Sequence, residues 1–203
     1  IYAGGLLGTM IKTIPTELFR VNTILDLSMF IEGLYNPNTN TAVSDTVSVY
    51  LRNSTAPYNS VDSAKGVLSA SGNVMLTFSG APSGQYYIII KHRNSLETWS
   101  RQGGEAFTAG VNFSYNLSDQ ITKAYGNNLK QVDSSPARFA IYSGDVNQDG
   151  NTDLTDVLII YNNASVFLSG YSVTDVNGDN LTDLSDVIIT NNNSAIYAER
   201  ITP

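Results

Sequence analysis

Apolar and polar residues alternate in short runs between residues 24 and 115. The clearest run is Asp45–Arg52 (DTVSVYLR), while Asn73–Phe78 and Val111–Tyr115 alternate less strictly. Alternation with a period of two places one set of side chains on a buried sheet face, so each run predicts a strand, and Ile24–Ile31 precedes them as the first. Gln85–Lys91 contains a continuous apolar stretch, which predicts a central strand covered on both faces.

Turn-forming residues separate these runs and set the predicted architecture. Several short strands punctuated by Gly, Pro and Asn predict an antiparallel β-sandwich of immunoglobulin-like or transthyretin-like type over residues 21–143. The last strand is expected to run through Tyr142–Gly144 into the C-terminal part of the chain. The turn signals are Asn36–Asn38, Ser71–Asn73, Ala81–Gly84 and Gly103–Gly104.

An internal repeat marks the C-terminal part. Asp145–Asp156 (DVNQDGNTDLTD) matches Asp175–Asp186 (DVNGDNLTDLSD) at an offset of thirty residues. Each acidic stretch precedes a short apolar run, so a short helix is predicted after each, with Thr155 and Ser185 as N-caps. Residues 144–203 are therefore expected to form a small α module, in a fold that is otherwise mainly β.

The net charge of −7 comes from this repeat. Eight acidic residues and no Lys or Arg lie between Asp145 and Asp186, although the whole chain has 18 acids and 11 bases. The remaining ten acids and eleven bases nearly balance. The acidity is thus a local cluster of oxygen ligands, and it argues against a nucleic-acid partner, which would need a basic surface. Abundant Ser, Thr, Asn and Tyr are typical of an extracellular or cell-surface β protein.

Little in the chain supports catalysis. There is no Cys, a single histidine (His92) and no nucleophile elbow, and the carboxylates outside the repeat show no paired spacing. We therefore predict that the protein is not an enzyme. His92 is expected at a solvated strand end, and Trp99 and the tyrosines are expected to pack in the core or on strand faces. No run is long and apolar enough to predict a membrane-spanning segment.

Both acidic stretches carry the ligand order of a twelve-residue calcium loop. Calcium needs six to eight oxygens, supplied from positions 1, 3, 5, 7, 9 and 12, with position 7 using its backbone carbonyl. Position 6 turns sharply and is Gly150 in the first loop but Asn180 in the second, which predicts a weaker, intact second site. The predicted ligands of two Ca²⁺ ions are Asp145, Asn147, Asp149, Asn151, Asp153 and Asp156, then Asp175, Asn177, Asp179, Leu181, Asp183 and Asp186.

Both loops have Asp at position 12, and each is followed by a predicted helix but not preceded by one, as it would be in an ordinary EF-hand. In these features the stretch from Gly144 to about Tyr197 resembles a dockerin module. The resemblance implies an extracellular bacterial or archaeal protein whose module needs calcium to fold, and a cohesin as the usual partner. Dockerins commonly present small residues at positions 10 and 11 and basic residues near positions 17 and 18. This chain instead has Leu154–Thr155 with Tyr161–Asn162, and Leu184–Ser185 with Asn191–Asn192.

The N-terminal residues 1–20 are apolar and Gly-rich, and they suggest how the protein associates. Ile1–Phe19 could add as a strand to another subunit, which makes a fibre if the contacts do not close. Our leading hypothesis is a non-catalytic extracellular structural protein that assembles with copies of itself or with other surface proteins. The alternatives are a dockerin-type anchor that joins a secreted enzyme to a cohesin-like receptor, and a carbohydrate-binding module that uses Tyr residues and Trp99.

Overall fold

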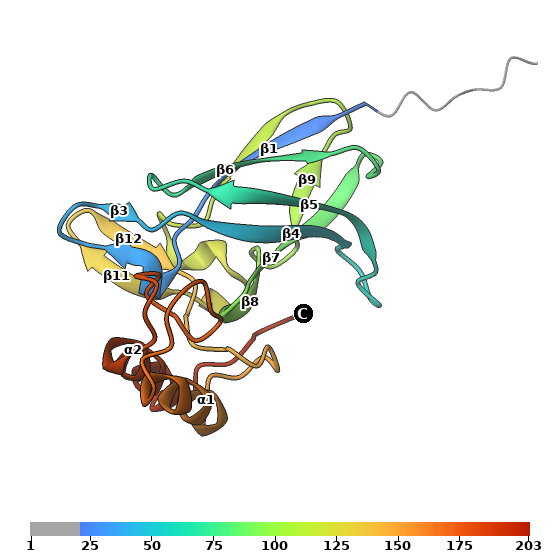
Figure 1. Ribbon diagram of the computed structural model, residues 1–203. Helices are drawn as coiled ribbons and strands as arrows, with labels where there is room; N and C mark the ends of the chain where they lie inside the picture. The colour runs from blue at the N-terminus through green and yellow to red at the C-terminus, as the bar shows by residue number, and fades with distance from the viewer. Residues whose placement is uncertain (1–20) are drawn as a thin grey trace, which may run out of the picture.

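A computed structural model describes residues 21–203, and the predicted assembly segment Ile1–Phe19 lies outside this range (Figure 1). The fold is mainly β, with the strands in the upper part of the view and two helices below them. One sheet has the order β10-β1-β6. Its central strand β1 (Thr23–Ser28) pairs antiparallel with β6 (Asn73–Phe78) and parallel with β10 (Phe113–Asn116). The expectation of purely antiparallel pairing was therefore wrong at this edge.

The second sheet has the order β5-β4-β7-β8, and β9 also pairs with β7. The sequence predicted β4 and β7 but missed β5, β8 and β9. β5 is an edge strand with only one buried residue, so its sequence SVDSAKGVL lacks an apolar period. The bounds are β4 Asp45–Asn53, β5 Ser60–Leu68, β7 Gly84–His92, β8 Ser95–Trp99 and β9 Glu105–Phe107.

Smaller elements complete the β part of the molecule. Two hairpins join β2 to β3 and β11 to β12, and three short 3₁₀ helices lie in the connections. The strands are β2 Tyr35–Asn36, β3 Thr41–Ala42, β11 Lys130–Ser134 and β12 Ala137–Ala140, and the 3₁₀ helices are η1 Glu32–Leu34, η2 Ile121–Lys123 and η3 Tyr125–Asn127.

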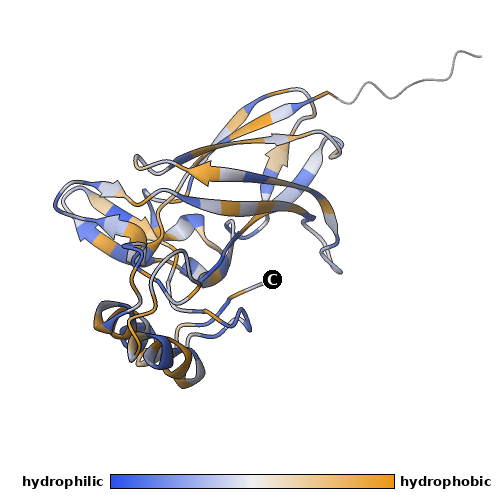
Figure 2. Ribbon diagram, viewed as in Figure 1, coloured by the Kyte–Doolittle hydropathy of each residue, from blue (hydrophilic) through white to orange (hydrophobic). Residues whose placement is uncertain are grey.

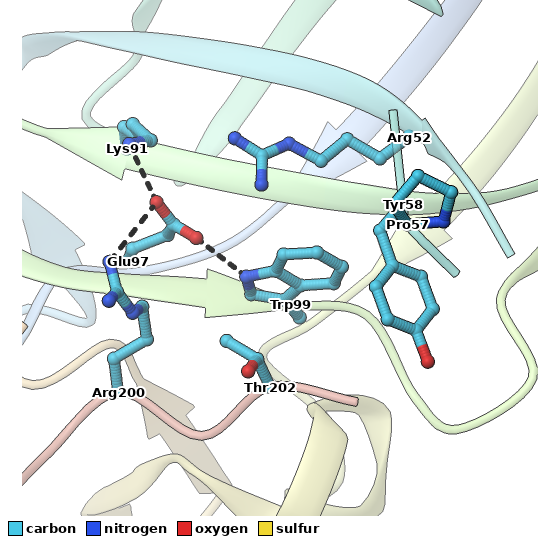
Figure 3. Close-up of a pocket in the computed structure, with 8 residues that line it drawn as sticks. All are labelled: Arg52, Pro57, Tyr58, Lys91, Glu97, Trp99, Arg200 and Thr202. Carbon is cyan, nitrogen blue, oxygen red and sulfur yellow. Dashed lines mark hydrogen bonds and ion pairs between the residues drawn. The ribbon is translucent and has the colours of Figure 1, made fainter. Parts of the chain in front are cut away.

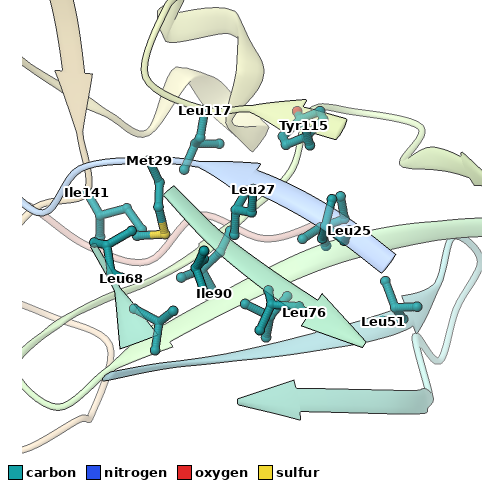
Figure 4. Packing of buried hydrophobic residues seen from close by; sticks show 14 of the residues in the cluster. Leu25, Leu27, Met29, Leu51, Leu68, Leu76, Ile90, Tyr115, Leu117 and Ile141 are labelled. Atoms are coloured by element: carbon teal, nitrogen blue, oxygen red, sulfur yellow. The ribbon is translucent and has the colours of Figure 1, made fainter. Parts of the chain in front are cut away.

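The main core lies between the two sheets. Leu25 and Leu27 of β1 face Leu51 of β4 and Ile90 of β7 across it (Figure 4). The strict alternation of buried residues along β4 confirms the period of two read from the sequence. The immunoglobulin-like or transthyretin-like type of the sandwich stays a prediction.

β7 is covered on both faces, as its continuous apolar run predicted. Ile88 and Ile90 face the main core, whereas Tyr87 and Ile89 pack with Trp99 on the other side of the sheet. Trp99 is only 3% exposed, and Tyr58 and Tyr87 pack edge-on against its ring. The indole therefore packs as expected, and it offers no open platform for a sugar.

The two predicted helices are present as α1 (Leu154–Ala164) and α2 (Leu184–Ser194). The predicted N-caps Thr155 and Ser185 were wrong. The caps are Asp153 and Asp183, whose carboxylates accept from the backbone N–H of Thr155 and Ser185 at 2.7 Å. The carboxylate at the third helical position accepts from the backbone N–H of each cap, and this reciprocal capping box explains why each cap lies two residues earlier than predicted.

The prediction for His92 was also wrong, because the side chain is buried. Its Nε2 lies 3.0 Å from Asp45 Oδ2 and its Nδ1 lies 3.0 Å from Ser95 Oγ. Tyr171, from the connection between the two repeats, donates its hydroxyl to Asp45 Oδ1 at 2.7 Å. Arg93 donates to Asp45 Oδ2 at 2.9 Å and covers the Tyr171 ring. Asp45 thus joins the sandwich to the C-terminal part.

A second polar junction lies under α2. Asn193 is fully buried and donates to Glu32 Oε2 at 2.5 Å and to the Ser143 carbonyl at 2.8 Å. Lys130 bonds both Glu32 and Asn193. Because buried polar groups are costly to leave unpaired, these bonds fix the helix against the sandwich.

Candidate functional site

The first acidic loop is closed by the carboxylate of Asp156. This side chain is fully buried, and its Oδ1 accepts from the backbone N–H of Val146 at 2.9 Å and of Asn147 at 3.2 Å. Its Oδ2 accepts from the N–H of Asp153 at 3.1 Å. The last residue of the predicted ligand order is therefore drawn back onto the first residues of the loop, which a closed ion-binding loop requires.

The second loop repeats these bonds at the offset of thirty residues. Asp186 Oδ1 accepts from the N–H of Val176 at 2.6 Å and of Asn177 at 3.0 Å, and its Oδ2 accepts from Asp183 at 2.9 Å. In both loops the residue at position 3 also accepts from the N–H at position 5 at 2.9 Å. The sequence repeat is thus a repeat of backbone geometry.

Each loop is tied to the segment that follows the helix of the other repeat. The Thr152 N–H donates to the Ala198 carbonyl at 2.8 Å, and the Arg200 N–H donates to the Gly150 carbonyl at 2.7 Å. The equivalent bonds in the second half, both 2.8 Å, join Thr182 to Leu168 and Gly170 to Asn180. The two repeats therefore hold one another closed, and neither loop is complete without the other repeat.

Position 6 has the left-handed backbone that the sequence predicted. Gly150 has φ of 95° and Asn180 has φ of 68°. A side chain in this region costs roughly 1–2 kcal/mol, and Asn tolerates it better than most residues. The second loop is therefore closed by a more strained turn than the first.

The surroundings of Asp145 in the first loop fit a bound cation. Asp145 is buried, and among residues 21–203 its Oδ1 has no hydrogen-bond partner. Burial, with the nearby charges of Asp156 and Asp149, raises the pKa of Asp145 to about 7. A buried carboxylate with an unsatisfied oxygen is costly, and a calcium ion would satisfy that oxygen and neutralise the charge.

The second loop fits less well. Both oxygens of Asp175 already accept backbone bonds, from Gly178 at 2.7 Å and from Asn180 at 3.1 Å. Burial still raises the pKa of Asp186, and the charge of Asp175 adds to the effect. These differences favour a stronger first site, in line with the difference predicted at position 6.

The remaining predicted ligands line the same loops. Asp153 and Asp183 use one oxygen each as helix caps, while Asn151 and Leu181 lie in the bridges to the opposite segments. Within residues 21–203, no three carboxylate or imidazole side chains gather closely enough to hold a metal by themselves. A calcium ion here would also need the amide oxygens and the backbone carbonyls of the predicted order. Binding of two ions stays a prediction.

Replacing Asn180 by Gly is expected to strengthen the second loop. The change relieves the left-handed strain, which should stabilise the calcium-loaded protein by about 1 kcal/mol and tighten the weaker site several-fold. Isothermal titration with calcium measures both sites. The reverse change, Gly150→Asn, is the matched control and should weaken the first site. Equal or lower affinity in the Asn180→Gly variant would contradict the strain argument.

No protein-family model and no curated protein matches the chain. The solved structures that resemble it loosely include two complexes. Both are type II cohesin–X–dockerin complexes from Acetivibrio cellulolyticus, one with a C-terminal and one with an N-terminal interface mutation. Identity is 17% and 18%, the TM-scores are 0.47 and 0.45, and the match covers 87% of this chain and 99% of those chains. Likeness at this level assigns neither a family nor a partner.

The helices of the described range are too short or too polar to cross a membrane.

Proposed function

We propose that this chain is a non-catalytic, extracellular assembly protein whose C-terminal module is dockerin-like and stabilised by two calcium ions. The observation that carries the proposal is the repeat of the closing bonds of Asp156 in those of Asp186, together with the buried and unsatisfied Oδ1 of Asp145 in the first loop. Calcium is structural in this proposal. Its ligands are the acidic loops, and the reciprocal bonds between the repeats transmit its stabilisation to both helices.

The helices supply a surface for association. Leu154 and Leu158 of α1 are 64% and 52% exposed, and the equivalent Leu184 and Ile188 of α2 are 66% and 50% exposed. Each pair is spaced by four residues and lies on one side of its helix, and Figure 2 marks apolar segments on both helices. Apolar rows repeated on two neighbouring helices are more typical of a protein interface than of a solvated surface.

The partner of these rows is expected to be another copy of the chain. The rows are apolar, and no Lys or Arg lies between residues 145 and 186 to attract an acidic receptor. An apolar, self-complementary contact therefore suits them better, with two calcium ions offsetting half the charge of the eight acids in the loops. The segment Ile1–Phe19, which lies outside the described range, is the second predicted contact. Two different contacts on one subunit are what a fibre needs.

Electron microscopy of the purified chain in calcium tests self-association. Filaments or closed oligomers are expected, and the double variant Leu158→Ser/Ile188→Ser should abolish them while leaving the melting temperature within about 2 °C, because both side chains are already exposed. Val67→Ser/Met75→Ser is the matched control, since these apolar residues are at least as exposed but lie on the sandwich. Removal of residues 1–19 tests the other predicted contact separately.

Single particles for the unmodified chain in calcium would contradict self-association. The second candidate would then apply: the same rows would anchor the protein to a cohesin-like receptor with an apolar face. Affinity capture with a panel of cohesins, compared between the unmodified chain and Leu158→Ser/Ile188→Ser, would test that reading directly. Filaments that survive both the helix variant and the truncation would contradict both predicted contacts.

A further inference from the structure

The outer face of the five-stranded sheet carries a row of polar residues that lie opposite one another on three neighbouring strands. The strand register aligns Lys65 of β5 with Ser48 of β4, and Ser48 with Lys91 of β7. Val47 and Val49 point into the core, so Ser48 and its neighbours point outward. Side chains directly opposite one another are about 5 Å apart, and the two lysines therefore flank β4 closely.

Two hollows lie along this face and share Lys91. One has a volume of about 350 Å³ and is bordered by Arg52, Lys91, Arg200 and Glu97 (Figure 3). The other, of about 280 Å³, is bordered by Lys65, Lys91 and Arg93. Volumes near 300 Å³ are at the lower end for small-ligand sites. Together the hollows form a basic groove, defined by these residues.

The cations of the basic groove outnumber its carboxylates. Glu97 pairs with Lys91 at 2.6 Å and lies 3.8 Å from Arg200, and Asp45 pairs with Arg93. Arg52 and Lys65 make no ion pair within residues 21–203. Five of the eleven Lys and Arg residues thus meet two carboxylates in a protein whose net charge is −7.

The guanidinium of Arg52 is positioned to donate hydrogen bonds to an oxyanion. The Arg52 Nε is buried and has no hydrogen-bond partner in the described part of the chain, and the guanidinium lies 5.3 Å from the centre of the Trp99 ring. Figure 3 shows this guanidinium reaching over Trp99 toward Lys91, with its terminal nitrogens facing the hollow. A guanidinium fixed by an aromatic ring loses little freedom when it binds an oxyanion in a bidentate manner.

Tyrosine rings border both hollows between the cations. Tyr58 borders the first hollow, and Tyr50 and Tyr171 border the second. Arg93 covers one face of the Tyr171 ring, and Lys91 lies 6.0 Å from the centre of the Tyr50 ring. Tyrosine rings held this close to cations suit a ligand that combines a flat apolar ring face with an anionic group. The shared Lys91 suits a ligand that repeats this unit.

We propose that the basic groove binds an acidic polysaccharide, with sugar carboxylates on Arg52, Lys65 and Lys91 and sugar rings against the tyrosines. A nucleic acid suits the groove less well, because Glu97 lies within it and the protein as a whole is acidic. This site uses the sandwich and its contact with the C-terminal tail, and it does not depend on the proposed function of the helices.

Fluorescence of Trp99, the single tryptophan, reports binding directly. Trigalacturonate should change the emission in a saturable, salt-sensitive way, whereas neutral maltotriose should not. Retardation of the protein in gels that contain polygalacturonate provides a second readout. The double variant Arg52→Ala/Lys65→Ala should weaken binding by at least about tenfold, since it removes two groups that would make charge-assisted hydrogen bonds to the sugar carboxylates.

The control variant is Lys123→Ala/Arg138→Ala. It has the same net charge as Arg52→Ala/Lys65→Ala, but its two substitutions lie outside the basic groove. It should bind within about twofold of the unmodified chain. The Lys65 side chain is exposed, so the single variant Lys65→Ala should weaken binding without any effect on folding. All variants keep the acidic loops, so equal binding by all of them would indicate calcium bridging and overturn the proposal. Triglutamate or single-stranded DNA that binds as tightly as trigalacturonate would overturn it as well.

Discussion

Removal of calcium by EGTA is expected to destabilise the two helices and to lower the melting temperature by on the order of 20 °C. A site filled at about a thousand times its dissociation constant contributes roughly 4 kcal/mol, and one kcal/mol shifts the midpoint of a chain this long by about 2–4 °C. Far-UV circular dichroism follows α1 and α2, and the emission of Trp99 on β8 follows the sandwich.

Asp145→Asn separates the first loop from the second in the same assay. The change removes one charge and keeps the shape, so it should abolish the stronger site and reproduce about half of the EGTA effect. Asp119→Asn is the matched control, because Asp119 is exposed and lies outside both loops. A melting temperature that is the same with calcium and with EGTA would show that the loops are stable through their backbone bonds alone.

The coupling between module and sandwich decides how far the unfolding spreads. Asn193 of α2 bonds Glu32 and Ser143, and Tyr171 bonds Asp45. Because both junctions are largely buried, loss of the helices would expose unpaired groups on the sandwich. We therefore expect the dichroism and the Trp99 emission to change in one transition rather than two.

The sequence was most informative where a local rule has no competitor. The alternation in β4 reflects burial on one face, and the apolar run in β7 reflects burial on both faces, so both strands were predicted. The left-handed turns at Gly150 and Asn180 follow from the loop spacing alone. β5 was missed because an edge strand with both faces partly solvated carries no period of two.

The errors arose where distant residues decide the outcome. The position of His92 at the end of β7 predicted exposure, yet Asp45, forty-seven residues away, covers and binds it. The same holds for the basic groove, since Lys65 and Lys91 become neighbours only through the pairing of β5, β4 and β7. The spacing of residues along the chain does not determine that strand register, which would have to be found from covariation between homologous sequences.

Asp45→Ala is expected to lower the free energy of unfolding by about 3–5 kcal/mol, because it leaves buried charged and polar groups without their acceptor. The carboxylate accepts from Thr46 N–H at 2.6 Å, Tyr171 hydroxyl at 2.7 Å, Arg93 Nε at 2.9 Å and His92 at 3.0 Å. Tyr171→Phe removes one of these bonds and should cost about 1 kcal/mol. Tyr197→Phe, at a highly exposed tyrosine, is the control.

The Asp45 contribution should also depend on pH. Burial opposes ionisation, but the hydrogen bonds from His92, Tyr171 and Thr46 outweigh it and hold the pKa of Asp45 well below its usual range. A carboxylate with a depressed folded-state pKa stabilises the protein above its unfolded pKa of about 3.9, and this stabilisation is lost as the pH falls below that value. The stability difference between the unmodified chain and Asp45→Asn should therefore shrink as the pH falls from about 5 toward 3. Urea titrations in excess calcium measure it, and because the acidic loops are common to both proteins their own titration cancels in the difference. A difference that stays constant down to pH 3, or an Asp45→Ala variant within about 1 kcal/mol of the unmodified chain, would show that Asp45 does not hold the module to the sandwich.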